Sequence, residues 1–453
     1  MTPRTPPFVP PYPPRGAAPV ATWRGLFGER ARTAVYGWSE AAFRLPYIRR
    51  KVLGYTVHIP LEPGLVQHVL LDNAAGYAKP DIVKSLLAPV IGRGLLTSDG
   101  TVWREQRRIV AASFTPAAVD ALVPIFANAA ARSAVSWRAG ETMDFATQAT
   151  TTTMRVIADA LFAGDPRLTS EQSMSHIAAA LEAFSEARIQ ALLGLPVFPV
   201  GRRGRAGRRG QTFLRDTLSE VVRERLGCGS EDFLSRIIQA LGERFGPEEG
   251  LALAVDNAAT FYLAGHETTA NAITWTLFLL SEQPDLQELA ARECRDALST
   301  LHDDPHLADR LPILRTILEE SLRLYPPVPR FDRQALAPDL LGDEKVAPGD
   351  IISIWPWLLH RHTALWDNPD EFSRKRFAPE AKVGIHRFQY LPFGGGSRIC
   401  VGARFATVEA LTILVHWLAH WSFTPTPSRS IRMSGMVTLR PAGGLPLIVE
   451  RRS

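Results

Sequence analysis

The chain has 453 residues, 46% hydrophobic residues and a formal net charge of +5. This length and composition suffice for a large core, and the mild positive excess does not indicate a nucleic-acid-binding protein. The three cysteines are widely spaced and odd in number, so we expect no disulfide framework and a reducing, cytoplasmic environment.

The first segment in chain order is a proline-rich tail, residues 1–19. It lacks the apolar run of a signal peptide or membrane anchor, and we expect it to be disordered or extended. No uninterrupted run of about 20 apolar residues occurs in the sequence, so no transmembrane helix is expected. Neither a repeat nor a long linker divides the remainder, so residues 20–453 are predicted to form one large domain.

The first half of the sequence predicts mainly helices. They are expected at 20–50, 65–71, within 117–163, at 171–193 and at 212–226, with a strand at 54–60. The apolar run 83–98 contains Pro89, Gly92 and Gly94, which interrupt helices, so a mobile loop is predicted there. The basic stretch 200–210 is predicted to be a solvated loop, while contact with an acidic partner or a membrane surface stays open.

Trp103 and Arg107 lie four positions apart and therefore share one face of a predicted helix. The indole N–H and the guanidinium group are donors only, which suits a ligand that presents a carboxylate. A packed tryptophan beside a surface arginine would give the same spacing, so this pair alone does not define a site.

A long apolar helix is predicted at 248–281, with polar residues in its middle. Gly265 costs helix stability but leaves room for a ligand against the backbone. The Thr268 hydroxyl can donate to the Ala264 carbonyl, four residues earlier, and so loosen the helix. A kinked core helix is the alternative interpretation.

Glu267 precedes Thr268, and the two side chains together could relay protons in an apolar pocket. His266 and Glu267 also begin the HExxH pattern of zinc proteases. The second histidine of that pattern would fall at position 270, which is Ala270, so the zinc interpretation fails. His266 is expected to have no chemical role.

Glu320 and Arg323 lie three positions apart in the amphipathic stretch 311–324 and face each other on a helix. Such a pair is usually a solvated bridge that contributes little stability. Turns then separate β-like runs, and strands are predicted within 340–359, 433–441 and 445–449.

Cys400 lies in a glycine-rich loop that is followed directly by a helical run from Ala403. The glycines 394–396 let the backbone turn tightly and point N–H groups toward the sulfur. These donors, and the positive helix end near Gly402, favour a thiolate that holds a soft metal. Gly402 lets a flat group approach, and Arg398 offers a fork of donors to a carboxylate on it. A buried structural cysteine is the alternative.

The residues at the fixed positions of this loop make it resemble the haem-binding loop of the cytochrome P450 family: Phe393, Gly396, Arg398, Cys400 and Gly402. The resemblance implies a mainly α fold with small β-sheets, an α-rich haem domain and a minor β-rich subdomain. It also implies that Cys400 is the thiolate ligand of the iron of haem b, with Phe393, Gly394 and Gly402 against the cofactor.

Three further motifs occur in the family's order. By resemblance, the haem propionates are bound by Trp103, Arg107, Arg333 and Arg398. The segment Ala264–Thr269 is similar to the oxygen-activating motif, in which Thr268, Glu267 and ordered water deliver protons. The substrate pocket is expected to be lined by Phe261, Ala264, Gly265, Thr269, Val328, Met436 and Val437.

Glu320, Arg323 and a later arginine, Arg376, resemble the family's buried ion-pair triad. The family's later segment usually reads Pro-Glu-Arg-Phe, whereas this chain has Arg374 and Lys375 at the first two positions. The departure leaves open which contacts support Arg376.

The sequence therefore predicts a monooxygenase that inserts one oxygen atom from O2 into a C–H or C=C bond of a small apolar substrate. No GxGxxG segment or iron–sulfur cysteine set occurs, so electrons are expected from a ferredoxin and its reductase. The enzyme is expected to be a cytoplasmic monomer without a membrane anchor. Two alternatives remain: a peroxide-using haem-thiolate enzyme, against which the Glu267–Thr268 pair argues, and a non-catalytic haem sensor.

Overall fold

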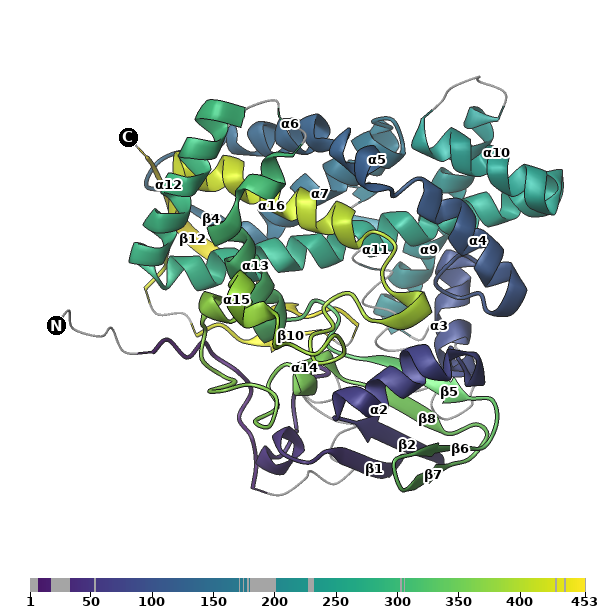
Figure 1. Cartoon of the computed structure of the whole chain (residues 1–453). Helices are drawn as coiled ribbons and strands as arrows, with labels where there is room; N and C mark the ends of the chain where they lie inside the picture. The colour runs from purple at the N-terminus through teal and green to yellow at the C-terminus, as the bar shows by residue number, and fades with distance from the viewer. Residues whose placement is uncertain are drawn as a thin grey trace.

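The structure, a computed structural model, describes residues 7–17, 33–52, 54–170, 172–173, 175–176, 179, 201–226, 232–301, 304, 306–427, 430–435 and 437–452. Long helices fill the upper part of Figure 1, and the largest sheet lies below them. The fold is mainly α with small β-sheets, as predicted. One hydrophobic cluster of buried side chains extends from Ala34 to Val449.

The α-helices of the described residues are α2 (Pro63–Gln67), α3 (Asp81–Ile91), α4 (Gly100–Ala112), α5 (Pro116–Asp120), α6 (Val123–Ala134), α7 (Phe145–Leu161), α9 (Gly201–Arg225), α10 (Phe233–Phe245), α11 (Pro247–Ser281), α12 (Pro284–Leu301), α13 (Pro312–Leu324), α14 (Pro356–Leu359), α15 (Pro379–Lys382) and α16 (Ala403–His420). Shorter helical turns relevant to the site are η2 (Glu40–Phe43), η3 (His68–Asp72), η7 (Arg374–Phe377) and η8 (Gly396–Arg398).

The strands of the described residues are β1 (Tyr47–Val52), β2 (Tyr55–Pro60), β3 (Tyr77–Ala78), β4 (Thr142–Asp144), β5 (Phe331–Ala335), β6 (Asp339–Leu341), β7 (Glu344–Val346), β8 (Ile351–Ile354), β9 (Trp421–Pro425), β10 (Met433–Ser434), β11 (Arg440–Pro441) and β12 (Pro446–Arg451). The largest sheet has the order β1-β2-β8-β5-β3, and a second has the order β4-β12-β9. The pairs β6-β7 and β10-β11 complete the sheets.

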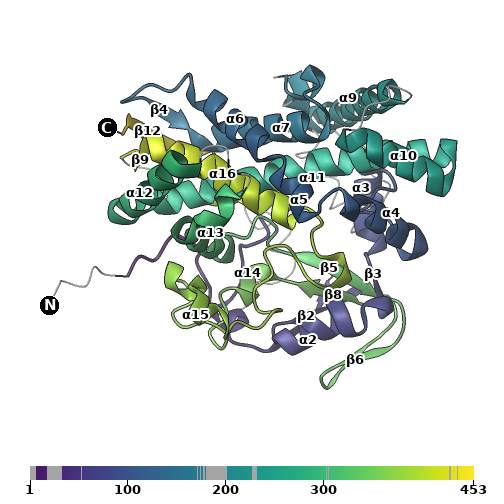
Figure 2. The same ribbon diagram turned by 45° about the horizontal axis from the view of Figure 1, so that its top comes forward.

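Helix α11 is the 35-residue centre of the helical layer. Gly246 precedes it at φ +84°, Pro247 occupies its first turn, and Glu248 and Glu249 place negative charge at its positive end. It packs against α7, α9, α10, α13 and α16. Figure 2 shows α16 running beside it. The predicted helix 248–281 is therefore confirmed, and it carries the Ala264–Thr269 motif through the interior.

The helix predicted for residues 20–50 is wrong where the structure describes it. Residues 18–32 lie outside the described residues, and the segment after them contains only the short turn η2 before strand β1. Strand β1 pairs with β2 in antiparallel register, from Tyr47 opposite Pro60 to Val52 opposite Tyr55. Cross-strand pairing overrides the local apolar pattern that favoured a helix.

Two predicted loops are helices in the structure. Helix α3 occupies most of 83–98; Pro89 lies in its last turn, and Gly92 ends it at φ +52°. Helix α9 occupies the basic stretch 201–210, whose arginines favour helix and whose glycines at 204, 207 and 210 are buried on one face. Tertiary packing outweighs the cost of helical glycine here. The predicted helix 171–193 lies mostly outside the described residues.

The proline-rich tail is extended, as predicted, but it is not disordered over residues 7–17. The Phe372 N–H donates to the Phe8 carbonyl at 2.9 Å, and the Tyr325 hydroxyl donates to the Pro11 carbonyl at 2.7 Å. The Arg15 guanidinium donates to Asp370 at 2.6 Å with a side chain only 8% exposed. The tail thus packs against the segment that follows α14.

Among the described residues, no single helix has both the length and the apolar character needed to span a membrane. A bent pair of segments, Gly100–Ala112 with Pro116–Ala134, meets that criterion by length and composition alone.

Replacing Arg15 with glutamine is expected to lower the free energy of unfolding by about 1–3 kcal/mol, because Asp370 loses a charge-assisted partner in a largely buried position. Denaturant unfolding measures the change. Arg44→Gln is the matched control, because Arg44 pairs with Glu40 only at 3.6 Å and is 66% exposed. Equal effects of the two substitutions would contradict a structural role for the tail.

Candidate active site

The backbone of the Cys400 loop requires glycine at positions 394 and 396. The Cys400 N–H donates to the Phe393 carbonyl at 2.9 Å, which closes the loop. Gly394 and Gly396 have φ of +71° and +67°, in the left-handed region that favours glycine. A Cβ on Gly396 would lie 1.7 Å from the Leu70 carbonyl oxygen. Turn η3 therefore packs directly against η8, and any side chain at position 396 would displace the loop.

The Cys400 side chain is accessible to solvent. Burial is nevertheless the largest influence on the pKa of its thiol and raises that pKa. The N–H of Gly402 donates to the sulfur and the Arg107 charge is near, and both act to lower the pKa.

Of the predicted donors, the Gly402 N–H at the helix end reaches the Cys400 sulfur, but it does not by itself favour the thiolate. Burial outweighs this hydrogen bond, so the pKa of the Cys400 thiol is raised overall. Helix α16 begins at Ala403 with Gly402 as its N-cap, as predicted. A sulfur with this environment suits a metal ligand, because a coordinated cation stabilises the thiolate directly.

Three cationic side chains lie close together: Lys79, Arg333 and Arg398. Sequence analysis identified the two arginines but not Lys79. Burial, followed by repulsion from Arg333 and Arg398, holds the pKa of Lys79 well below its ordinary value. Burial, followed by repulsion from Arg398, lowers the pKa of Arg333 to about 10. Asp99 receives hydrogen bonds from Arg398, which also donates to the Ser98 carbonyl at 3.1 Å.

This cationic cluster, Lys79, Arg333 and Arg398, contains more positive than negative charge. Asp99 offsets one of the three charges, while Asp332 is engaged by Arg330 at 2.5 Å and by Ser353 at 2.6 Å. Asp99, which also pairs with Lys84 at 2.9 Å, and Asp332 act on these cations, yet burial still lowers the pKa values of Lys79 and Arg333, because removing a charge from water is costly. A ligand with two carboxylates, as haem has, would match this excess.

Trp103 and Arg107 share one face of α4, as predicted, but their surroundings differ. The guanidinium of Arg398 lies over the Trp103 ring, 4.2 Å from its centroid. Arg107 is close enough to Cys400 for the thiolate charge to raise its pKa, against a larger lowering by burial. Trp103 thus supports the cationic cluster, whereas Arg107 lies toward the sulfur.

The central turn of α11 contains the side-chain hydrogen bond that its sequence predicts. The Thr268 hydroxyl donates to the Ala264 carbonyl at 2.8 Å. Ala264 keeps accessible surface, although most residues of this helix are buried. His266 is buried with Nδ1 2.6 Å from the Tyr262 carbonyl, and burial lowers its pKa. This arrangement fits a histidine without a chemical role.

Three of the predicted pocket residues are directed elsewhere. A Cβ on Gly265 would lie 2.6 Å from Ile157 of α7, so this glycine makes room for helix packing and not for a ligand. Thr269 is buried, and its hydroxyl donates to the Gly265 carbonyl of its own helix at 3.1 Å. Phe261 packs in an aromatic cluster with Phe114 and Phe233, at centroid distances of 6.1 and 5.9 Å.

Ala264, Val328 and Val437 keep accessible surface and remain predicted pocket walls. Val328 is half-buried and Val437 is 44% exposed. Met436 lies outside the described residues. Within the described residues, no cluster of three or more His, Cys, Asp or Glu side chains could hold a metal ion.

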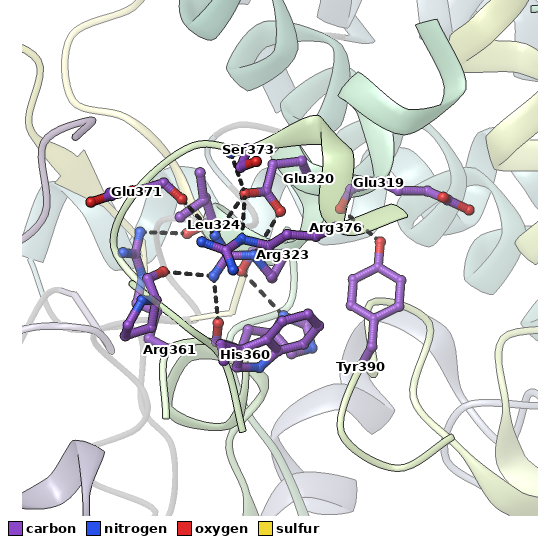
Figure 3. A network of polar contacts seen from close by, with 12 residues as sticks. Glu319, Glu320, Arg323, Leu324, His360, Arg361, Glu371, Ser373, Arg376 and Tyr390 are labelled. Atoms are coloured by element: carbon purple, nitrogen blue, oxygen red, sulfur yellow. Dashed lines mark hydrogen bonds and ion pairs between the residues drawn. The ribbon is translucent and has the colours of Figure 1, made fainter. Parts of the chain in front are cut away.

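The ion pair of Glu320 and Arg323 is fully buried and central to the network in Figure 3. Arg323 donates to both carboxylate oxygens of Glu320, at 2.7 and 2.8 Å. Its other donors reach the carbonyls of His360, Pro369 and Glu371, at 2.7, 2.6 and 3.0 Å. All five guanidinium N–H groups are therefore engaged, and the predicted triad core is confirmed.

Arg376 is the third member of the triad, at the distance of a weaker ion pair. Its Nε lies 3.4 Å from Glu320 Oε1, and its Nη2 donates to the Asn368 carbonyl at 2.9 Å. The Ser373 N–H donates to the same Glu320 oxygen at 2.7 Å. Backbone groups of the segment around η7 thus support the triad, although Arg374 and Lys375 depart from the usual pattern.

His360, which sequence analysis missed, joins this network to the Cys400 loop. Its Nδ1 lies 3.2 Å from the Arg323 carbonyl, and its Nε2 accepts the Leu391 N–H at 2.8 Å. The two contacts require a neutral ring with the proton on Nδ1. Burial, followed by the Arg323 charge, lowers the pKa of His360 to about 3. No spacing in the sequence relates position 360 to positions 323 and 391.

The cytochrome P450 family model matches residues 43–445, so the chain belongs to the cytochrome P450 family of haem-thiolate monooxygenases. It is 32% identical to cyclooctatin synthase of Streptomyces melanosporofaciens over 87% of this chain and 86% of that protein. It is 28% identical to LUTEIN DEFICIENT 5 of Arabidopsis thaliana, over 86% and 70%.

The crystal structure of the cytochrome P450DA heme domain is also similar, with a TM-score of 0.82, 22% identity and coverage of 98% of both chains. At that identity the likeness shows the fold. The family implies a haem cofactor, O2, an organic substrate and redox partners.

Arg323→Lys is expected to destabilise the protein by about 3–5 kcal/mol, because an ammonium cannot reach all the acceptors and Glu320 keeps a buried charge without its fork. Denaturant unfolding measures the loss. Arg315→Lys is the control on the same helix, because Arg315 pairs with a half-exposed Asp309. A change below about 1 kcal/mol in Arg323→Lys would contradict the central role of this pair.

Stability is expected to fall as the pH falls from about 6.5 toward about 3, with His360 as one cause. Its pKa is lower in the folded chain, so the unfolded chain binds the proton first and acid favours unfolding. Between pH 7 and 5.5 this residue should account for about 1 kcal/mol. Urea unfolding at both pH values should show a smaller loss in His360→Gln; an identical loss would contradict the assignment.

Proposed function

We propose that the chain binds haem b through the Cys400 thiolate and inserts one oxygen atom from O2 into a C–H or C=C bond of a small apolar substrate. The observation that carries the proposal is the accessible Cys400 thiol at the start of α16, which receives a hydrogen bond from the Gly402 N–H. Bound haem supplies the activation of dioxygen. The protein supplies the ligand, the enclosure and the protons.

The cationic cluster supports this choice of cofactor. Lys79, Arg333 and Arg398 would pair with the two propionates of haem b, with Asp99 holding Arg398 in place. Trp103 orients the same guanidinium by stacking beneath it. Arg107, nearer the sulfur, would offset the negative charge of the thiolate.

Thr268 and Glu267 are the proposed catalytic residues. Thr268 holds its hydroxyl at the accessible turn beside Ala264, where ordered water can reach it. Glu267 is the neighbouring carboxylate and supplies protons to that turn. Val328 and Val437 supply part of the apolar surface that excludes bulk water. The substrate class is therefore an apolar organic molecule.

Electrons come from a ferredoxin and its reductase, in a cytoplasmic, monomeric enzyme. The chain has no dinucleotide-binding glycine motif and no cysteine set for an iron–sulfur cluster. Its few cysteines, of which the described Cys294 and Cys400 are free, suit a reducing compartment.

Cys400→Ala is expected to abolish the red-shifted absorption band of the reduced, carbon monoxide-bound protein, because that band depends on a thiolate ligand.

The oxidant is tested separately, by turnover. Screening for a change of the haem spin state in the parent protein identifies an apolar compound, which then serves as the substrate. Product should form with reduced ferredoxin and O2 and much less with peroxide alone. A band retained in Cys400→Ala would refute the ligand, and efficient turnover with peroxide alone would favour the peroxide-using alternative.

A further inference from the structure

The net positive charge of the chain is concentrated at the start of helix α9. Residues 202–209 contain five arginines and no acidic residue. The chain has 51 lysines and arginines against 46 aspartates and glutamates, so the rest of the molecule is formally neutral. Helix α9 lies at the upper edge of the helical layer in Figure 2. The excess charge is therefore a local property of one peripheral helix.

Helix α9 turns its arginines outward because its opposite face is buried. The glycines at 204, 207 and 210 lie three positions apart and are buried, and the helix packs against α3, α10 and α11. The side chains of Arg205, Arg208 and Arg209 are exposed. Residues three and four apart are neighbours on a helix surface, so these three guanidinium groups form one basic cluster.

This basic cluster lacks the counter-charges that other arginines of α9 have. Arg215, farther along the helix, pairs with Asp256 of α11 at 2.9 Å. No ion pair joins Arg205, Arg208 or Arg209 to a carboxylate of the described residues. Like charges on adjacent turns repel one another, so a bound anion would stabilise this face of the helix.

The basic cluster lines a surface concavity of about 490 Å³, a volume typical of a site for a small molecule. The other described residues of its lining are Thr212, Phe213 and Asp216. The Phe213 ring is half-buried and stacks on the His176 ring, with centroids 4.4 Å apart and planes 28° apart. The concavity thus has a cationic end, a supported aromatic side chain and one carboxylate.

The order of these groups along α9 indicates what the concavity would bind. At a rise of about 1.5 Å per residue, Phe213 lies about 12 Å and Asp216 about 16 Å along the axis from Arg205. Guanidinium forks match phosphate oxygens, an aromatic ring stacks on a planar base, and a carboxylate accepts from hydroxyl or amino groups. A nucleoside polyphosphate carries these groups in the same order.

A membrane surface suits this face less well. A helix that lies on a membrane inserts large apolar side chains beside its basic ones. None of the described residues of α9 is an exposed large apolar side chain. The carboxylate of Asp216, at one end of the concavity, would also repel an extended anionic surface.

We propose that this concavity on α9 binds a nucleoside polyphosphate. The phosphates bind to Arg205, Arg208 and Arg209, the base stacks against Phe213, and Asp216 accepts a hydrogen bond from the nucleoside. The proposal goes beyond the oxygenation of an apolar substrate and does not depend on it, because the site is built on a helix that does not carry the Cys400 loop.

Calorimetric titration of the haem-loaded protein with ADP at low salt tests the site. ADP is expected to bind more tightly than pyrophosphate, and adenosine more weakly than either. Arg208→Gln and Arg209→Gln should each weaken ADP binding about tenfold or more, because each removes a charge-assisted hydrogen bond. Arg223→Gln is the matched control, since Arg223 is exposed on the same helix but outside the concavity, and it should leave the affinity unchanged.

Two further variants test the nucleoside end of the site. Phe213→Leu should weaken ADP binding about fivefold or more through lost stacking and leave pyrophosphate binding unchanged. Asp216→Ala should weaken ADP binding but strengthen pyrophosphate binding, because the carboxylate that it removes attracts the nucleoside and repels the phosphates. Asp216 is exposed, so its removal leaves the core intact.

Three results would overturn the proposal. Equal losses in Arg208→Gln and Arg223→Gln would show a general attraction of anions to a basic helix. Binding of phosphatidylserine vesicles without binding of ADP would assign the basic cluster to a membrane surface. A shift of the haem absorption bands on adding ADP would place the adenine at the iron and not on α9.

Discussion

The buried guanidinium of Arg323 sets the path of the chain from α13 to the Cys400 loop. Each of its five N–H groups is engaged, two with Glu320 and three with carbonyls of the segment 360–371. An irregular segment cannot satisfy its own carbonyls as a helix does, so it needs donors of this kind in the interior. His360 then receives the Leu391 N–H and extends the same order to the loop that carries Cys400.

The ion-pair network around Arg323 and the cationic cluster around Arg398 differ in how their buried charges are compensated. Around Arg323 the opposite charge and the acceptors are all within the chain. Around Arg398, the described residues provide Asp99 and leave the cations Lys79 and Arg333 with lowered pKa values. The first arrangement is complete in the protein alone, whereas the second is suited to a bound dianion. This contrast separates a structural network from a binding site without reference to any relative.

Local signals in the sequence predicted much of the site. The spacing of Glu320 and Arg323 and the back-bond from Thr268 to Ala264 depend on neighbouring turns of one helix, and both were correct. Lys79 and His360 were missed, because their partners lie hundreds of positions or several elements away and no helical or strand period relates them. The same limit made the predicted helix 20–50 wrong over its described part, residues 33–50, whose end pairs with β2 as strand β1.

Gly265 belongs to the predicted motif, but its role in the structure differs from the role that was predicted. The glycine was expected to admit a ligand, but Ile157 of α7 occupies the space that a side chain would need. Thr153, also on α7, donates to the His266 carbonyl at 3.0 Å and holds the same turn. Helix α11 is therefore packed against α7 at Gly265 and His266, whereas Ala264 of the same turn keeps accessible surface. Gly265 thus serves the packing of two helices.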